Sequence, residues 1–198
     1  ITPIVKHFKV FSEVNEIAQQ HQADLVVMGS HGSSGFKEFV IGSNAEKVIR
    51  NAEIPVLVVK EKLKSVDFSN IIFITNFENE MIDVFIKAKQ ITNSFDAHLK
   101  LLNVNILTDR FESTTELDEK IIQFFDNAEW HTDRQKDVIR ISDYTVEKGV
   151  INYTKAHQTD LVIIPTHGRK GLNHFFSGSI AEDIVNHSKV LIMTIKID

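Results

Sequence analysis

Hydrophobic residues from position 70 onward alternate between two patterns. Short apolar runs rich in β-branched residues are typical of buried parallel strands, and they lie at 70–77, 97–106, 136–142, 160–166 and 190–196. Between these runs, helix-forming segments with helically spaced apolar residues are predicted at 81–91, 114–130, 145–158 and 179–187, although Gly149 weakens the third. Strands that alternate with helices predict an α/β fold with a doubly wound, five-stranded parallel sheet.

A repeat runs through the chain at a constant offset of 136 positions. Residues 21–60 align without a gap on residues 157–196, and 14 of the 40 aligned positions are identical, which indicates an internal duplication. The predicted domains are the C-terminal half of a first unit at 1–62, a charged and polar linker at 63–69, and a complete second unit at 70–198. The first unit is thus expected to be truncated at its N-terminus.

Composition narrows the classes of partner. The net charge of -5 and a pI near 6.0 give no basic face of the kind that nucleic-acid binding needs. The chain has no cysteine, so it can form no disulfide and no thiolate metal site. No apolar run approaches the ~20 residues that span a bilayer. We therefore expect no nucleic-acid or membrane partner, and a cytoplasmic location.

Each copy of the repeat places glycines between a strand and a helix that begins at Gly-Ser. This arrangement puts unpaired backbone N–H groups and the positive end of a helix dipole at the carboxyl edge of the sheet, where phosphates bind. Neither GxGxxG nor GxxxxGK[ST] is present, so neither a Rossmann fingerprint nor a P-loop is supported.

A structural reading competes with phosphate binding at both loops. Both helices open with S-x-x-E, at Ser43 and Ser179, and a capping box alone accounts for that pattern. Three glycines at fixed distances are harder to explain by capping, so the first loop favours phosphate binding. In the second loop Pro165 replaces the first glycine, which removes an N–H donor and fixes φ, so the structural reading is favoured there.

The sequence offers no committed catalytic group. His31 and His167 are predicted to lie in the two loops, where they would contact phosphate, act as acid or base, or simply bond the backbone, and the last is the simplest reading. The histidines show no metal-binding spacing, and neither a Ser-His-Asp pattern nor a thiol nucleophile is present. We expect no catalytic residue and no metal ligand.

The pattern Gly29-x2-Gly32-x9-Gly42-Ser43, set between "DLVVM" and "AEKVIRNAEIPVLVVK", resembles the nucleotide-binding signature of the universal stress protein family. The resemblance covers essentially the whole chain. It implies an adenine-nucleotide-binding-like α/β fold and pairing of units through their last strands. In members with intact glycines it also implies ATP or AMP binding, with Mg²⁺ only beside bound ATP.

Carried over residue by residue, the resemblance implies a set of cofactor-binding positions. Asn76 stands where the family usually has an aspartate that holds the adenosine, and an amide lacks the charge of that carboxylate, so affinity should fall. Val104 matches a backbone contact to adenine. The remaining positions are Gly29, Gly32, Gly42, Ser43 and Asn44 in the first copy, and Gly168, Gly178, Ser179 and Ile180 in the second.

These observations leave three functional hypotheses. The leading one is an adenine-nucleotide-binding module of the stress response that does not turn its ligand over. The second is a structural dimerisation module without nucleotide, which Pro165 and Asn76 support, and the third is slow ATP hydrolysis. The strands at 56–60 and 190–196 are the expected pairing edges, either with each other or between chains of a homo-oligomer.

Overall fold

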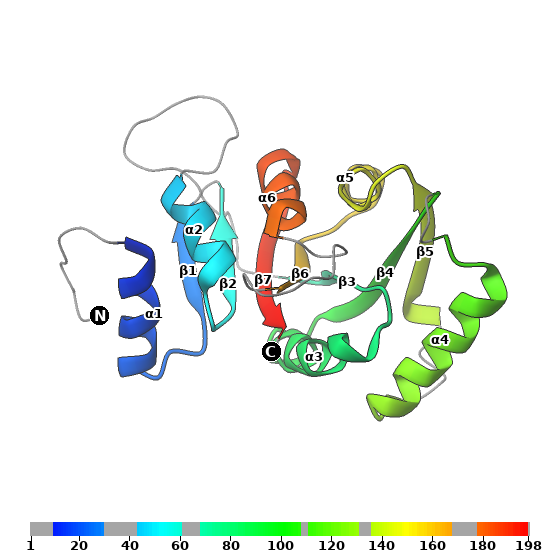
Figure 1. The fold of residues 1–198 in the computed structure, drawn as a ribbon, viewed down its shortest axis with the longest axis horizontal. Helices are drawn as coiled ribbons and strands as arrows, with labels where there is room; N and C mark the ends of the chain where they lie inside the picture. The colour runs from blue at the N-terminus through cyan, green and yellow to red at the C-terminus, as the bar shows by residue number, and fades with distance from the viewer. Residues whose placement is uncertain are drawn as a thin grey trace.

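The computed structural model describes residues 10–29, 43–60, 68–107, 111–130, 136–167 and 178–197. These residues form one seven-stranded sheet with helices on both faces. In Figure 1, helices α5 and α6 lie on one side of the sheet, and α3 and α4 lie on the other. The architecture is therefore the α/β class that the alternating pattern predicts.

The elements follow the predicted order. The strands are β1 (Val26–Gly29), β2 (Val56–Val59), β3 (Asn70–Ile74), β4 (His98–Ile106), β5 (Val138–Asp143), β6 (Leu161–His167) and β7 (Leu191–Ile197). The helices are α1 (Val10–Gln20), α2 (Ser43–Asn51), the 3₁₀ helix η1 (Asn79–Met81), α3 (Ile82–Ser94), α4 (Thr114–Asn127), α5 (Val146–Ala156) and α6 (Gly178–His187). Each predicted strand and helix from position 70 onward is confirmed within a few residues. The first strand ends earlier, at Ile74.

The predicted five-stranded parallel sheet is part of a larger, seven-stranded mixed sheet. The order is β1-β2-β7-β6-β3-β4-β5, and every pair is parallel except β2 with β7, which is antiparallel. The last strand of the first copy thus extends the sheet of the second copy. An unpaired strand edge leaves N–H and C=O groups without partners. The pairing of β2 with β7 satisfies the facing edges of these two strands within one chain.

The sequence repeat is also a repeat in register. Strand β1 pairs with β2 from Val26↔Val56 to Gly29↔Val59. At the offset of 136 positions, β6 pairs with β7 from Val162↔Ile192 to Pro165↔Ile195. The two copies therefore build the same strand pair. The domain boundaries stay a prediction, and residues 63–67 of the predicted linker lie outside the described residues.

Aromatic side chains fill the space between the sheet and helices α3 and α4. The Phe85 ring is tilted against that of Trp130 at a centroid distance of 4.6 Å, and it contacts the Phe124 ring at 5.4 Å. Phe73, Phe77 and Phe125 extend this buried cluster. Burying one such side chain contributes about 1.5–3 kcal/mol, so the cluster is a main source of stability for residues 68–197.

Gly149 forms part of α5 despite its low helix propensity, and close packing gives the reason. A Cβ atom at this position would lie 2.6 Å from Cγ1 of Val104 on β4. Only glycine lets the helix approach the strand this closely. The residue that weakened the helix prediction is therefore a contact point between α5 and the sheet.

Within the part of the chain that the structure describes, no helix combines the length and the apolar character needed to cross a membrane.

Candidate functional site

The strand order of the sheet reverses between β3 and β6. From β3 the chain continues to β4 on one side, and from β6 it continues to β7 on the other side. The carboxyl ends of these neighbouring parallel strands lie at one edge of the sheet, which is where ligands of open α/β sheets bind. Thr75 and Asn76 follow β3 at this edge, and His167 ends β6.

The segment after β3 is a tight turn held by two buried side chains. The Thr75 hydroxyl oxygen accepts a hydrogen bond from the Phe77 N–H at 2.9 Å, and Asn76 Oδ1 accepts one from the Glu78 N–H at 3.1 Å. Phe77 has a φ of 59° and is buried, so it holds a left-handed conformation that is unfavourable for a side chain of its size. Such strain is retained where surrounding packing determines the backbone.

The hydrogen bond to Glu78 decides what Asn76 can offer a ligand. Its Oδ1 is already an acceptor in the turn, and within the described residues its Nδ2 makes no hydrogen bond. The side chain is only 7% exposed. Asn76 is thus a positioned donor, whereas an aspartate at the same place would offer only acceptors.

Asn103 on β4 is a neighbour of this turn that the sequence interpretation missed. Its Nδ2 donates to the Thr75 carbonyl at 3.2 Å, while its buried Oδ1 has no hydrogen-bond partner among the described residues. Leaving such an acceptor unpaired costs about 1–3 kcal/mol. The signal that could have revealed it is one polar residue inside the apolar run "LLNVNI".

Val104 is buried, and its side chain is occupied by packing against Gly149. The ladder between β3 and β4 ends at Ile74↔Leu102, but β4 continues to Ile106. Its backbone therefore extends past the end of β3, beside the turn at Asn76. This position suits the backbone contact that the resemblance implies.

His167 is predicted to lie in a loop, but in the structure it belongs to β6. His167 is the last residue of the strand, and its side chain is 10% exposed. Its Nε2 lies 3.4 Å from Oε1 of Glu80 on η1, without the geometry of a hydrogen bond. Pro165 is accommodated because the ladder between β6 and β3 ends at Ile163, so a missing N–H breaks no bond there.

Both helices begin at the predicted Gly-Ser junctions, α2 at Ser43 and α6 at Gly178. Asn44 and Ser179 lie in their first turns, and Ile180 is buried. In the first copy, Gly29 ends β1 and is exposed. Three further predicted positions, Gly32, Gly42 and Gly168, lie outside the described residues. His31 also lies outside them.

The sheet separates the predicted positions into two groups. Asn76, Val104 and α6 belong to the side of the sheet built on β3, β4 and β6, whereas Gly29 and α2 belong to β1, beyond β7 and β2. Strand β6, the equivalent of β1 in the second copy, has β3 as its outer neighbour. Within the described ranges, β1 has no strand in that place. The first copy thus lacks a described counterpart of the turn at Asn76.

An acidic residue that could have capped α6 is engaged elsewhere. Glu182 Oε1 accepts hydrogen bonds from Nε and Nη2 of Arg50 at 2.9 and 2.6 Å, which joins α6 to α2. Burial raises the pKa of Glu182. Among the described residues, no group of three or more histidine, cysteine or acidic side chains is arranged to hold a metal ion.

Comparison with known proteins places this architecture in a family. The universal stress protein family model matches residues 2–60 and 85–196. A universal stress protein of Methanocaldococcus jannaschii is 49% identical over 53 residues, which is 27% of this chain and 31% of that protein. The match thus spans about a third of the relative's length.

One solved structure shares the fold over most of this chain, and a second, less similar one contains a bound nucleotide. A functionally unknown protein of Pseudomonas aeruginosa superposes with a TM-score of 0.72 at 15% identity, covering 97% of this chain and 69% of its own. A universal stress protein in complex with cAMP has a TM-score of 0.49 at 12% identity, covering 67% of this chain and 99% of its own. Because the family model matches well over half of its residues, the chain belongs to the universal stress protein family.

Proposed function

We propose that this chain is an adenine-nucleotide-binding module of the stress response that binds AMP or ATP without dedicated catalytic groups. The observation that carries the proposal is the turn after β3, where the buried Asn76 presents a free amide donor at the switch point of the sheet. Helix α6 begins beyond the neighbouring strand, so its N-terminus is the expected phosphate side. Mg²⁺ would accompany ATP only.

The proposed nucleotide site belongs to the second copy, residues 70–198, with residues 1–62 as the C-terminal half of a first unit. The first copy carries the glycine pattern, but its described part lacks the groups that would hold adenosine. In the second copy we assign that role to Asn76 and Val104, with the amide of Asn76 in place of a carboxylate. We therefore expect weak, saturable binding.

The Asn76→Asp variant tests this placement, because aspartate keeps the acceptor that holds the Glu78 N–H while it replaces the donor with a second carboxylate oxygen. A charged acceptor toward a ribose hydroxyl or adenine amine is stronger than a neutral group. Isothermal titration with AMP should show about five- to tenfold tighter binding. The control Asn93→Asp adds the same charge at an exposed position in the last turn of α3, and it should leave AMP affinity unchanged.

If AMP affinity is the same in Asn76→Asp and in the unaltered chain, the placement at this turn is wrong. Absence of saturable binding in both would favour the second candidate function, a structural module. The observation that favours it is the joining of the copies: β2 pairs with β7, and Arg50 links α2 to Glu182.

The last strands of the two copies are not free to pair with another chain. Strand β2 lies between β1 and β7, and β7 lies between β2 and β6, so both last strands have neighbours on each side. A homo-oligomer would need another surface. The oligomeric state, slow ATP hydrolysis and the cytoplasmic location stay predictions.

A further inference from the structure

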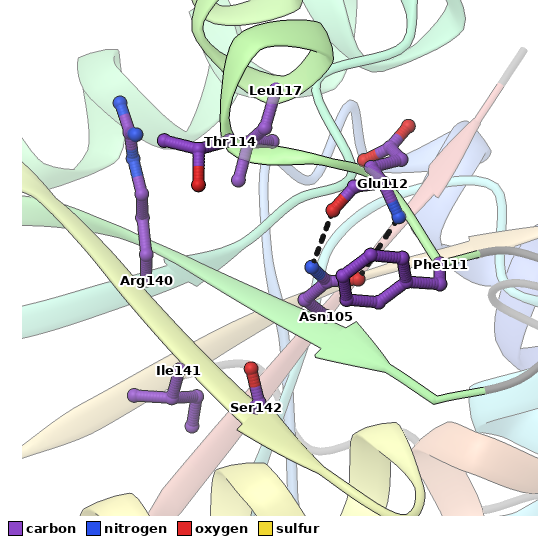
Figure 2. Close-up of a pocket in the computed structure, with 8 residues that line it drawn as sticks. All are labelled: Asn105, Phe111, Glu112, Thr114, Leu117, Arg140, Ile141 and Ser142. Carbon is purple, nitrogen blue, oxygen red and sulfur yellow. Dashed lines mark hydrogen bonds between the residues drawn. The ribbon is translucent and has the colours of Figure 1, made fainter.

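A cavity of about 270 Å³ lies beside the outer strand β5. Its walls come from the ends of β4 and β5 and from the start of α4, as Figure 2 shows. Its lining includes Asn105, Phe111, Thr114, Leu117, Arg140 and Ser142. This volume is near the lower end of the ~300–1,000 Å³ of small-molecule sites, so a small ligand is the fitting occupant.

Backbone register places the polar groups of the cavity on one face. Asn105 is aligned with Ser142, and Arg140 lies two residues before Ser142, so the three side chains point to the same side of the sheet. Figure 2 shows Arg140 and Ser142 rising from β5 on the side that α4 covers. Val104, which packs on α5, points to the opposite side. The cavity therefore lies on the α4 side of the sheet and one strand further out than the turn at Asn76.

The floor of the cavity is fixed, whereas one apolar wall is exposed. Asn105 Nδ2 donates to the Glu112 carbonyl at 2.8 Å, and Asn105 Oδ1 accepts from the Glu112 N–H at 3.2 Å. These paired bonds fix the segment that carries Phe111, whose side chain is 55% exposed. In Figure 2 the Phe111 ring lies beside Asn105. Leu117, buried on α4, provides the apolar surface opposite.

Arg140 is the cation that remains accessible at this cavity. Its Nη1 pairs with Asp118 Oδ1 at 2.5 Å, and the two side chains are 37% and 49% exposed. An exposed pair of this kind contributes only about 0–1 kcal/mol, so a ligand anion can share or replace it. Lys120, by contrast, is held between Glu112 at 2.6 Å and Glu78 at 2.7 Å. Within the described residues, the hydroxyls of Ser142 and Thr114 have no partner.

We infer that this cavity binds a small monocarboxylate with an apolar body. The guanidinium of Arg140 receives the carboxylate, the hydroxyls of Ser142 and Thr114 donate to its oxygens, and the body packs between Phe111 and Leu117. A dianion such as phosphate fits less well, because Glu112 lines the cavity and Asp118 pairs with Arg140, and their repulsion of a ligand grows with its negative charge. The site thus selects singly charged, partly apolar ligands.

Benzoate is a suitable probe of this cavity. Benzamide has nearly the same shape but no charge, so it serves as the control. We expect two-dimensional NMR of the full chain to show saturable shifts of the amide signals of Asn105, Glu112 and Ser142 with benzoate. Benzamide should bind at least about tenfold more weakly, as expected for loss of a charged hydrogen bond. Inorganic phosphate should also bind more weakly than benzoate.

Two variants assign the roles. Arg140→Gln should weaken benzoate about tenfold, and Phe111→Ala, at an exposed position, should weaken it severalfold. Arg50→Gln removes an arginine from another exposed ion pair and should leave benzoate affinity unchanged. AMP affinity should be the same in Arg140→Gln as in the unaltered chain, which separates this site from the proposed nucleotide site.

Equal affinity for benzoate and benzamide, unchanged benzoate affinity in Arg140→Gln, or tighter binding of phosphate would each overturn the proposal. So would an absence of shifts at these three amides at millimolar benzoate.

Discussion

The two copies of the repeat build the same strand pair in very different surroundings. Val27 on β1 and Ile163 on β6 occupy equivalent positions, yet Val27 is 60% exposed and Ile163 is 0% exposed. Strand β6 has β3 on its other side, whereas β1 has no such neighbour in the described ranges. The comparison teaches that the local sequence determines register, while the neighbouring elements determine burial.

A retained aspartate makes the same point. Asp160 Oδ2 accepts hydrogen bonds from the N–H groups of Ser69 and Asn70 at 2.9 and 2.8 Å, and so holds the start of β3 beside β6. Its counterpart Asp24 is exposed and makes no such bond within the described part of the chain. The first copy thus has the same carboxylate acceptor in Asp24, but its described part has no strand equivalent to β3 for this side chain to hold.

The largest expected effect contrasts the two equivalent strand positions. Ile163→Ala removes buried methyl groups from the centre of the sheet and should lower the free energy of unfolding by about 2–5 kcal/mol. Val27→Ala at the exposed counterpart should change it by less than about 0.5 kcal/mol. Urea denaturation of both variants measures the difference, and similar losses would contradict the contrast in burial.

A second contrast concerns the helices that precede these strands. Gly149 on α5 corresponds to Glu13 on α1, and only the former meets a close neighbour in β4. Gly149→Ala would place Cβ 2.6 Å from Val104 Cγ1, so despite the better helix propensity of alanine we expect a loss of about 1–3 kcal/mol. Glu13→Ala should be nearly neutral. A Gly149→Ala variant with raised stability in thermal unfolding would show that the contact relaxes freely.

The junction of the copies supplies a smaller, pH-dependent effect. Lys60 Nζ donates to the carbonyl of Ser188, and burial lowers the pKa of Lys60 from 10.5 to about 8. Between these two values the unfolded lysine holds a proton that the folded one has lost, so the free energy of unfolding rises with pH. Because the side chain is only half-buried, we expect a rise of about 1 kcal/mol from pH 7.5 to 10.

Comparison with Lys60→Met isolates this contribution, since other titrating groups are common to both proteins. Urea denaturation at several pH values should show that the rise is missing from the variant. Lys196→Met, at the equivalent position of the second copy, controls for the general loss of a lysine charge. If the unaltered chain and Lys60→Met differ by a constant amount at every pH, Lys60 does not titrate in this range.

Sequence patterns predicted the elements well because the apolar runs of the second copy are buried strands and remain continuous. They could not decide the partner of β2, because its apolar residues suit pairing within the chain and between chains equally well. The role of Gly149 depends on the distance to Val104, and that of Asn103 on the end of β3. Such distances between separated segments leave little trace in one sequence.

The candidate site was predictable in kind and less so in detail. The helix starts at Ser43 and Gly178 follow from glycine and capping patterns, and the structure has both. The hydrogen bond that leaves Asn76 with only its donor free could not be foreseen from residue type alone. Nor could the strand-end position of His167, because a short apolar run does not fix its last residue.

The central claim is that adenine nucleotide binds where β3 and β6 end. Two-dimensional NMR of the amide groups during titration with AMP tests it most directly. We expect saturable shifts at Asn76, Val104 and Ile180, with the signals of β1 little changed. Shifts confined to β1 and α2, or no saturable shift at millimolar AMP, would contradict it.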